Sequence, residues 1–277
     1  MSLEGTAALV TGGGSGIGLG CARWLARDGA SVTICGRSKE RLDAAVPEIE
    51  SIAADGATVQ AVVCDVTDED EVRAAVEQAT AGTGSLDAVV ASAGGSETIG
   101  PVTQVDVEAF RRTLDVNVVG TFLTLKHAAA VMVRAGGGSF IGLSSIAGSR
   151  THRWFGAYGP AKAGIEALVA MAADELGPSN VRVNAIAPGL VDTELVAGVT
   201  EGGPVLDDYL DQMPIERVGT VDDIASAARW LAGPESSWVT GQVLHVDGGH
   251  SLRRGPIYQA FLEPVFGKDG LRGVVEG

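Results

Sequence analysis

Tyr158 and Lys162 lie four residues apart in the segment YGPAK, and Ser145 lies thirteen residues before the tyrosine. Positions i and i+4 share one face of a helix, so the pair would place an ammonium group beside a phenol hydroxyl. A free phenol has a pKa of about 10, and a nearby cation favours its ionised form. Such a tyrosine can give or take a proton near neutral pH, while a serine hydroxyl holds a substrate oxygen against it. The alternative is a half-buried tyrosine beside a surface lysine, and the rest of the chain must decide.

The composition describes a globular protein with an aliphatic core. The chain has 277 residues, of which 45% are hydrophobic and 5% aromatic, enough for one large domain or two small ones. Its 39 glycines follow no collagen-like period, so we assign them to tight turns. The net charge of −15 argues against a nucleic-acid partner, because phosphates would be repelled.

Neither the cysteines nor the N-terminus indicate a secreted or membrane protein. Cys21, Cys35 and Cys64 are an odd count at no metal-ligand spacing, so we predict reduced thiols and no metal site. The segment MSLEGTAALVTGG has no basic region followed by a long apolar stretch, so we expect no signal peptide. We find no uncharged apolar run of about 18 residues and expect no membrane span. The cytoplasm is the expected compartment.

Short apolar segments rich in β-branched residues alternate with longer amphipathic ones. This alternation predicts βαβ units and an α/β fold, a doubly wound parallel seven-stranded sheet with helices on both faces. Capping boxes are predicted at Thr67 with Asp70 and at Thr220 with Asp223. The predicted strands are 6–10, 31–35, 58–64, 88–92, 139–144, 182–187 and 243–246, and the predicted helices are 17–28, 39–54, 69–81, 108–135, 159–177 and 221–233.

Two stretches depart from this alternation. Residues 190–215 are apolar but irregular, and we expect them to be the substrate loop of a single catalytic domain over residues 1–250. Residues 251–277 form a C-terminal extension with Tyr258, Phe261 and Phe266, three of the thirteen aromatic residues. We predict that this extension packs on the domain or on a neighbouring subunit, where it would close the active site.

The first predicted strand ends in TGGGSGIG, residues 11–18, and a helix follows. Glycines let the backbone turn sharply and approach a pyrophosphate held at the helix N-terminus. The spacing of Gly12, Gly16 and Gly18 differs from the usual G-x-G-x-x-G pattern, and such a turn alone could be only a tight loop. Its place between a strand and an amphipathic helix indicates a dinucleotide site.

The end of the second predicted strand bears on which dinucleotide binds. An acidic residue often stands there and holds the ribose hydroxyls. Here Gly36 takes that place and Arg37 follows, so a 2′-phosphate would meet no repulsion and could pair with the guanidinium. We predict NADP as the preferred cofactor, with NAD possible, although Ser15 in the glycine-rich turn offers no second positive charge. The alternative is a solvated arginine at the start of the next helix.

Together these residues resemble the short-chain dehydrogenase/reductase family in its short single-domain form, including its 3-oxoacyl reductases. The resemblance covers about residues 3–250 and implies a Rossmann fold and hydride transfer between NAD(P) and a secondary alcohol or ketone. One departure is ASAG at 91–94, where the family often has Asn-Asn-Ala-Gly; we expect Ser92 to keep the strand tether. The matching motifs are TGGGSGIG, Asp65-Val66, Ala93-Gly94, Asn117, Ser145, Tyr158-x-x-x-Lys162 and Pro188-Gly189.

The resemblance implies a role for each position. Tyr158 would be the general acid/base, and Ser145 would orient the substrate oxygen. Lys162 would lower the pKa of Tyr158 and bond the nicotinamide ribose, and Asn117 would hold a water linking Lys162 to solvent. Asp65 would contact the adenine and Thr193 the nicotinamide carboxamide, unless they are a strand-end acid and a helix N-cap. The implied cofactor contacts are Gly12, Ser15, Gly16, Ile17, Gly18, Arg37, Asp65, Val66, Ala93, Gly94, Tyr158, Lys162, Pro188, Gly189, Val191 and Thr193.

The predicted substrate pocket is largely apolar, which suits a hydrophobic ketone, an acyl chain or a steroid-like ring. Arg150, His152 and Arg153 could meet an anionic group or belong to a solvated loop. The motifs do not separate 3-oxoacyl reductases from alcohol or sugar dehydrogenases. The expected substrate contacts are Trp154, Phe155, Leu195 and Tyr209, with Gly95, Ser96, Val196, Leu206 and Met213 near them.

Two other functions are weighed against the oxidoreductase, a catalytically silent dinucleotide-binding protein and an epimerase or dehydratase that uses the cofactor transiently. Asn117, Ser145, Tyr158 and Lys162, the catalytic tetrad that the resemblance implies, are all present, which favours catalysis. An epimerase or dehydratase usually needs more substrate-binding chain beyond the core, which favours a simple oxidoreductase. The family's usual assembly implies a homotetramer, with one interface through helices 108–135 and 159–177 and another through strand 243–246 and the last helix.

Overall fold

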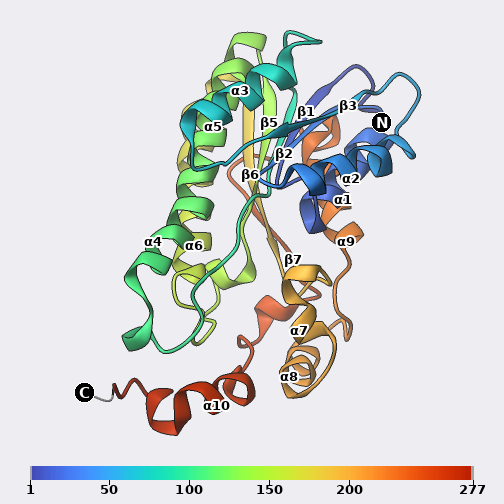
Figure 1. Cartoon of the computed structure of the whole chain (residues 1–277). Coiled ribbons are helices and arrows are strands. Elements are labelled where there is room, and N and C mark those ends of the chain that lie inside the picture. The colour runs from blue at the N-terminus through green and yellow to red at the C-terminus, as the bar shows by residue number, and fades with distance from the viewer. Residues whose placement is uncertain (1, 276–277) are drawn as a thin grey trace.

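Seven parallel strands form one sheet in the order β3-β2-β1-β4-β5-β6-β7, in a computed structural model that describes residues 2–275 (Figure 1). The strand order reverses between β1 and β4, and ligands of such sheets bind at the carboxyl ends of the strands near that point. The predicted doubly wound seven-stranded sheet is confirmed. The strands are β1 (Ala7–Thr11), β2 (Ser31–Gly36), β3 (Val59–Val63), β4 (Ala88–Ala91), β5 (Gly138–Leu143), β6 (Val181–Pro188) and β7 (Val243–Val246).

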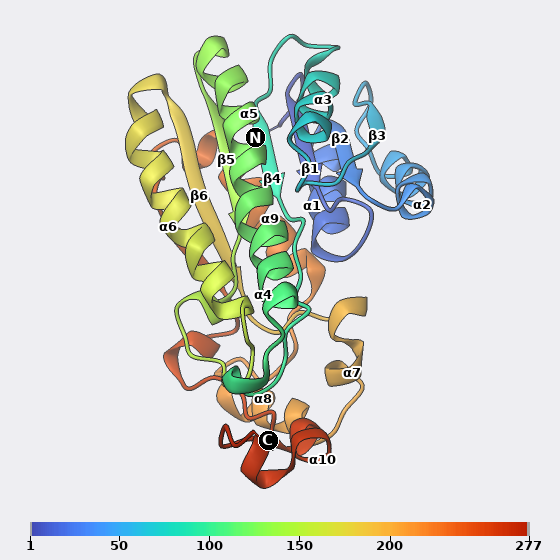
Figure 2. The same cartoon turned by 60° about the vertical axis from the view of Figure 1, so that its left-hand side comes forward.

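Helices cover both faces because successive strand residues point to opposite sides. In β1, Leu9 joins one buried core, while Ala8 and Val10 join the other. One face carries α1 (Gly16–Arg27), α2 (Lys39–Glu50) and α9 (Val221–Ala232). The other carries α3 (Glu69–Thr80), α4 (Val107–Leu114), α5 (Gly120–Ala135) and α6 (Tyr158–Leu176), as Figures 1 and 2 show.

The predicted element ends are mostly within two residues of those observed, and α2 ends earlier than predicted, at Glu50. Thr220 and Asp223 form the predicted capping box of α9. The predicted box at Thr67 with Asp70 is wrong, because the carboxylate of Asp68 accepts the first N–H groups of α3 instead. An aspartate at the N-cap is a stronger acceptor for these donors than a threonine hydroxyl.

The predicted helix 108–135 contains an irregularity that its sequence pattern does not show. Between α4 and α5 the chain makes one π-helical turn, η2 (Asp115–Val119). The segment Val107–Ala135 is long and apolar enough to cross a membrane, but half of its most apolar window is buried. It packs against α3, α6 and the sheet and is therefore a core helix.

Residues 190–215 are less irregular than predicted, since they contain η5 (Glu194–Val196), α7 (Ala197–Thr200) and α8 (Pro204–Gln212). These helices are too short to show a clear period. The C-terminal extension follows with the turn η7 (His250–Leu252) and the helix α10 (Gln259–Gly270). Figures 1 and 2 place α7, α8 and α10 together at one end of the molecule.

A third core joins the extension to residues 190–215. Tyr258 and Phe266 make their contacts in it within the chain, which is the first of the two alternatives that we predicted for the extension. Phe261 is 38% exposed. The buried members of this core are Leu190, Val199, Val205, Tyr209, Met213, Tyr258, Leu262 and Leu271.

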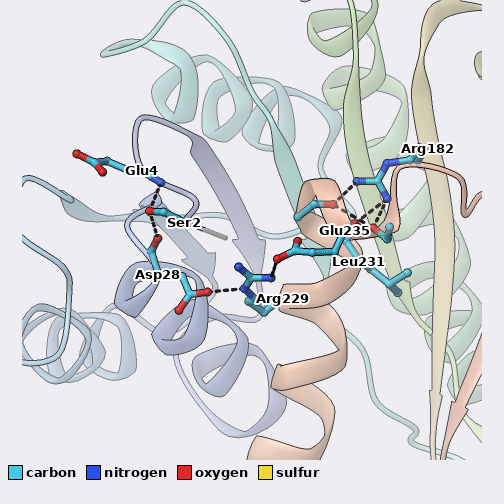
Figure 3. A network of polar contacts seen from close by, with 9 residues as sticks. Ser2, Glu4, Asp28, Arg182, Arg229, Leu231 and Glu235 are labelled. Carbon is cyan, nitrogen blue, oxygen red and sulfur yellow. Dashed lines mark hydrogen bonds and ion pairs between the residues drawn. The ribbon is translucent and has the colours of Figure 1, made fainter.

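A network of charged groups fixes α9 against the sheet (Figure 3). Arg229 of α9 pairs with Asp28 at the end of α1 and with Glu235, whose carboxylate lies 2.7 Å from the guanidinium. The guanidinium of Arg182, on β6, donates to the carbonyl of Leu231 at 2.8 Å. Together with the packing of α1 on α9, these bonds fix the C-terminal end of α1 and the helix α9 against the sheet.

Candidate active site

The glycine-rich turn lies directly against the loop that follows β4. Gly12 has a φ of +66°, and a Cβ there would lie 3.0 Å from the backbone of Ala93. A Cβ on Gly18 would lie 2.3 Å from the carbonyl oxygen of Gly12, so neither position tolerates a side chain. The backbone N–H of Ala93 donates to Thr11 Oγ1 at 3.1 Å, and this bond makes the tether that we predicted for Ser92. The turn is thus a cradle of bare backbone, which fits a pyrophosphate.

Helix α1 begins at this cradle with Gly16, preceded by Ser15. The Ser15 side chain caps no N–H group of the first turn, which leaves these donors for an anion. The methyl group of Thr193 would lie 3.6 Å from a Cβ on Gly16, so the loop after β6 covers the turn. Ile17, next in α1, packs partly buried against the core of that face.

The structure reveals a second cation beside the turn that sequence reasoning missed. Arg37 is exposed at the end of β2, as expected. In the first turn of α2, Arg41 Nη1 donates to Ser15 Oγ at 3.3 Å, and Nη2 lies 3.1 Å from a carboxylate oxygen of Glu194. The sequence signal that could have identified Arg41 is its position four residues after Arg37. The two guanidinium groups could therefore both meet a 2′-phosphate.

The residues predicted to contact the adenine and the nicotinamide also lie along the carboxyl edge of the sheet. Asp65 follows β3 and accepts from the N–H and hydroxyl of Thr67; the first of these bonds is the main cause that lowers its pKa. Val66 is buried against α5, where a Cβ on Gly120 would lie 2.6 Å from it. At the end of β6, Pro188 is buried, as is Val191 just beyond, and a Cβ on Gly189 would lie 2.9 Å from Asp247.

Tyr158 begins α6, and Ser145 follows β5, so both stand at the carboxyl edge of the sheet. Burial raises the pKa of Tyr158, and the hydrogen bond with Ser145 lowers it by a smaller amount. The neighbouring Ser144 is buried and bonded to α6 through the Lys162 carbonyl and Glu166, at 3.1 and 2.7 Å. Ser145 is thus the serine that faces the tyrosine.

Lys162 lies one turn after the tyrosine and is 5% exposed. Its Nζ donates to the carbonyl of Leu143 at 2.8 Å and lies 5.5 Å from the centre of the Tyr158 ring. Burial lowers the pKa of Lys162 to about 8. Burial and the Ser145 hydroxyl shift the pKa of Tyr158 in this structure. The lowering of that pKa by Lys162 stays a prediction.

Asn117 lies in the π-helical turn and is fully buried. Its Nδ2 donates to the carbonyl oxygens of Gly95 and Thr113, at 2.7 and 2.8 Å. A Cβ on Gly94 would lie 2.6 Å from Asn117 Oδ1 and 3.2 Å from Lys162 Nζ, so both polar groups flank this glycine. The extra residue of a π turn re-aims a helix side chain, and such turns are frequent at functional sites.

Aromatic side chains surround Tyr158. The ring centre of Phe155 lies 6.2 Å from that of Tyr158 and 4.9 Å from that of Tyr258. Trp154 Nε1 donates to the Leu271 carbonyl of the extension at 3.2 Å. Tyr209 is buried in the third core, whereas Leu195 is 75% exposed and lies outside it. The structure therefore does not support Leu195 as a substrate contact.

The three basic residues of this loop are already engaged within the chain. Arg150 Nε donates to the Ser251 carbonyl at 2.5 Å, and Arg153 stacks on Trp154, with its Cζ 4.4 Å from the ring centre. His152 lies against Phe155, and burial lowers its pKa. The structure offers no support for an anion site in this loop.

The chain is similar over most of its length to known reductases and dehydrogenases. The family model described as enoyl-(acyl carrier protein) reductase matches residues 12–251. Cis-4-hydroxycyclohexanecarboxylate dehydrogenase of Sinomonas cyclohexanicum is 40% identical over 88% of this chain and 96% of its own length. The 3-oxoacyl-[acyl-carrier-protein] reductase of Chlamydia muridarum is 36% identical over 89% and 98%. A 2,5-dichloro-2,5-cyclohexadiene-1,4-diol dehydrogenase of Sphingobium indicum is 35% identical over 89% and 97%.

Solved structures show the same likeness. A short-chain type dehydrogenase/reductase from Mycobacterium ulcerans has a TM-score of 0.98 at 55% identity, over 99% of this chain and all of that one. The chain therefore belongs to the short-chain dehydrogenase/reductase family and is an NAD(P)-dependent dehydrogenase acting on CH–OH groups.

The similar structures include both forms of the cofactor. A 7α-hydroxysteroid dehydrogenase complexed with NADH and 7-oxo glycochenodeoxycholic acid has a TM-score of 0.83 at 35% identity, over 90% of this chain and 95% of that one. A gluconate 5-dehydrogenase of Burkholderia cenocepacia in complex with NADP and tartrate has a TM-score of 0.85 at 29% identity, over 91% and 97%. The glycine cradle of this chain fits the pyrophosphate that both cofactors share.

Proposed function

We propose that the protein interconverts a secondary alcohol and a ketone, with Tyr158 as the general acid/base. The observation that carries this proposal is the meeting of Ser145, Tyr158, Lys162 and Asn117 at the carboxyl edge of the sheet, next to the glycine cradle. The nicotinamide of the bound cofactor supplies or accepts the hydride. A silent dinucleotide-binding protein would not need these four side chains together.

In ketone reduction, Tyr158 donates its phenol proton to the carbonyl oxygen, and the Ser145 hydroxyl orients that oxygen by a hydrogen bond. In alcohol oxidation the proton moves the other way, from the alcohol hydroxyl to Tyr158, and Ser145 orients the same oxygen. Because burial raises the pKa of Tyr158, its phenolate must be stabilised for work near neutral pH. Moving a phenol pKa from about 10 to about 7 takes about 4 kcal/mol, which the Lys162 ammonium and a positively charged nicotinamide together would supply.

The remaining tetrad residue, Asn117, would return the proton to solvent. Asn117 and Lys162 flank Gly94 from two elements, α6 and the π turn, so a water between them would join the lysine to the loop after β4. The amide of Asn117 is fixed by its two carbonyl partners and holds such a water without rearrangement.

We propose NADP as the preferred cofactor. No acid ends β2 to bind the ribose hydroxyls, Arg37 follows that strand directly, and the Arg41 guanidinium donates to Ser15 of the cradle. The remaining contacts follow the edge from Asp65 and Val66 at the adenine to Thr193 at the carboxamide.

The substrate class that we propose is a compact alcohol or ketone with an apolar carbon frame. Phe155, Trp154 and the third core form an apolar wall beside Tyr158. Two of the relatives carry names that place the hydroxyl on a six-membered carbon ring. The side chains around the tyrosine are aromatic and apolar, which suits such a ring, and we propose cyclic alcohols as the first substrates to test.

Tyr158→Phe is the direct test of this function. The variant keeps the ring and loses the proton donor, so kcat should fall by about 10²–10⁴-fold while NADPH still binds. Absorbance at the reduced-nicotinamide band measures turnover of cyclic alcohols with NADP and with NAD, and nucleotide fluorescence measures binding. Near-normal turnover in Tyr158→Phe would remove the tyrosine from the mechanism.

We also propose a cytoplasmic homotetramer. Apolar side chains are exposed on the two surfaces that the family's interfaces imply, Phe122 and Met171 on α5 and α6, and Trp230 and Trp238 near β7. Trp238 is 99% exposed, which is unusual for the largest apolar side chain. Size-exclusion chromatography with light scattering measures the mass of the assembly, and the mass of a monomer would reject the tetramer.

A further inference from the structure

The three tyrosines of the chain gather around the active site. Besides Tyr158, Tyr209 comes from α8 and Tyr258 from the segment just before α10. The ring of Phe155 contacts the rings of both Tyr158 and Tyr258. The pKa of Tyr209 is raised mainly by burial and also by the charges of Tyr258 and Tyr158. Two further phenol hydroxyls therefore lie close to the catalytic one.

The hydroxyl groups of Tyr209 and Tyr258 are buried but poorly satisfied. The side chains are 5% and 6% exposed, and their oxygens are 3.4 Å apart, where hydroxyl pairs usually lie about 2.7–2.8 Å apart. Neither hydroxyl has another hydrogen-bond partner among residues 2–275. One long bond uses one donor and one lone pair, so the pair keeps a free donor. Buried hydroxyls normally have hydrogen-bond partners. We therefore expect a third oxygen atom to bind between the hydroxyl groups of Tyr209 and Tyr258.

His250 adds an acceptor to the same cluster. It is 1% exposed, and its ring meets that of Tyr209 edge-on at 5.4 Å. Nε2 lies 3.0 Å from the carbonyl oxygen of Arg254, so it must carry the ring proton. Nδ1 is then an acceptor, and it is buried with no hydrogen-bond partner in the described part of the chain. Burial lowers the pKa of His250, which keeps the ring neutral at pH 7.

The surroundings of the cluster disfavour an anionic ligand group. The Arg254 guanidinium pairs with Asp208, and its Nη1 lies 2.8 Å from the Asp208 carboxylate. The backbone N–H of Ile257 donates to the same carboxylate. Asp247, near His250, accepts from the N–H groups of Gly249 and Ser251. A carboxylate placed beside the tyrosines would lose its hydration without gaining a cation. The third oxygen must therefore be neutral.

We propose that Tyr209, Tyr258 and His250 form a second polar subsite, which binds a neutral hydroxyl of the substrate remote from the carbon that reacts. The inference rests on the proposed function, because Tyr158 and Ser145 hold the reacting oxygen. A hydroxyl accepts from the tyrosines and donates to the imidazole, whereas an ether or a ketone can only accept. The preferred substrates are accordingly diols or hydroxyketones on a compact apolar frame.

Three alcohols that differ at one position test the subsite: cyclohexanol, 4-methoxycyclohexanol and cyclohexane-1,4-diol. In the wild type, kcat/KM for the diol should exceed that for cyclohexanol by about tenfold or more, mainly through KM, with the ether between them. Tyr209→Phe and Tyr258→Phe, which remove single oxygen atoms, should each bring the ratio of kcat/KM for the diol to that for cyclohexanol to within about threefold of one.

Thr103→Val is the control. It removes the hydrogen bond from Thr103 to the Gly273 carbonyl of the extension and leaves the tyrosine cluster unchanged, so it should keep the wild-type ratio.

A wild-type ratio near one would overturn the subsite, and so would an unchanged ratio in both tyrosine variants. Calorimetric titration of the diol and of cyclohexanol into the protein with NADP⁺ distinguishes failure of the subsite from failure of the proposed function. If no alcohol is oxidised, the reaction is rejected. The subsite then stands only if the diol binds more tightly than cyclohexanol to the wild type and to Tyr158→Phe but not to Tyr258→Phe.

Discussion

At the scale of single residues, Lys162 shows what the site costs the fold. Its ammonium is buried with the Leu143 carbonyl as its hydrogen-bond partner, and burial lowers its pKa from 10.5 to about 8. Between these two values the unfolded chain holds a proton that the folded chain has lost. Stability therefore rises with pH across this window, and below about pH 8 the full cost of burying the charge remains. Gly94 makes room for the same ammonium, because a Cβ there would lie 3.2 Å from Nζ.

Lys162→Met removes this titration and makes the cost measurable. Relative to the variant, the wild type should gain about 3 kcal/mol of unfolding free energy between about pH 8 and pH 10.5, since the shift is about 2.5 units. Urea denaturation of both proteins at a series of pH values gives this difference. Lys126→Met is the control, because Lys126 is half exposed and paired with Glu69. A difference that does not vary with pH would mean that Lys162 is not held at a lowered pKa.

At the scale of elements, the proposed preference for NADP depends on the start of α2. Arg37 stands before the helix, and Arg41 within its first turn donates to Ser15 of the glycine cradle. The pair of Arg41 with Glu194 is no obstacle to a phosphate, because both side chains are largely exposed and such pairs contribute about 0–1 kcal/mol.

Arg37→Ala and Arg41→Ala should each raise KM for NADP by about 10-fold or more, because each removes a charge-assisted bond of about 1.5–3 kcal/mol to the 2′-phosphate. KM for NAD should change by less than about threefold, since NAD lacks that phosphate. Initial rates with each nucleotide measure the split. Lys39→Ala tests for a general effect of charge, because Lys39 lies on the same helix and pairs with Asp43 at 2.6 Å. Equal losses with both nucleotides would contradict a 2′-phosphate site.

The elements also show how far the sequence alone could predict the site. Strands such as AVVA in β4 are apolar throughout, and the glycine turn follows the first strand of the chain, so the sheet and its carboxyl edge could be predicted from local patterns. The π turn at Asn117 could not, because the helical period runs through it without a break. The contact of Arg41 with Ser15 and the pairing of Tyr209 with Tyr258 join segments far apart in the chain, which no local pattern specifies.

At the scale of the whole molecule, the face on which we propose that the substrate binds is assembled from segments that meet only in the fold. The loop before α6, the helix α8 and the extension after β7 converge below the carboxyl edge of the sheet (Figure 2). The third core that joins them is small and separate from the two cores that flank the sheet. Regions with few buried apolar contacts open without global unfolding, so this face is the part that can loosen first.

Leu262→Ala should loosen the extension and leave the sheet intact. Leu262 of α10 is 5% exposed in the third core, and truncating a buried leucine costs about 2–5 kcal/mol. That cost falls on the docking of the extension, which carries Tyr258, so KM for the alcohol should rise about 10-fold while KM for NADP stays within about twofold. Val265→Ala is the matched control, because Val265 lies one turn further along α10 and is 73% exposed. Limited proteolysis, read by mass, should cut Leu262→Ala within residues 253–275 well before the wild type. Equal digestion and equal KM in the two variants would show that the extension is held by its polar bonds to Thr103, Gln104 and Trp154 rather than by the third core.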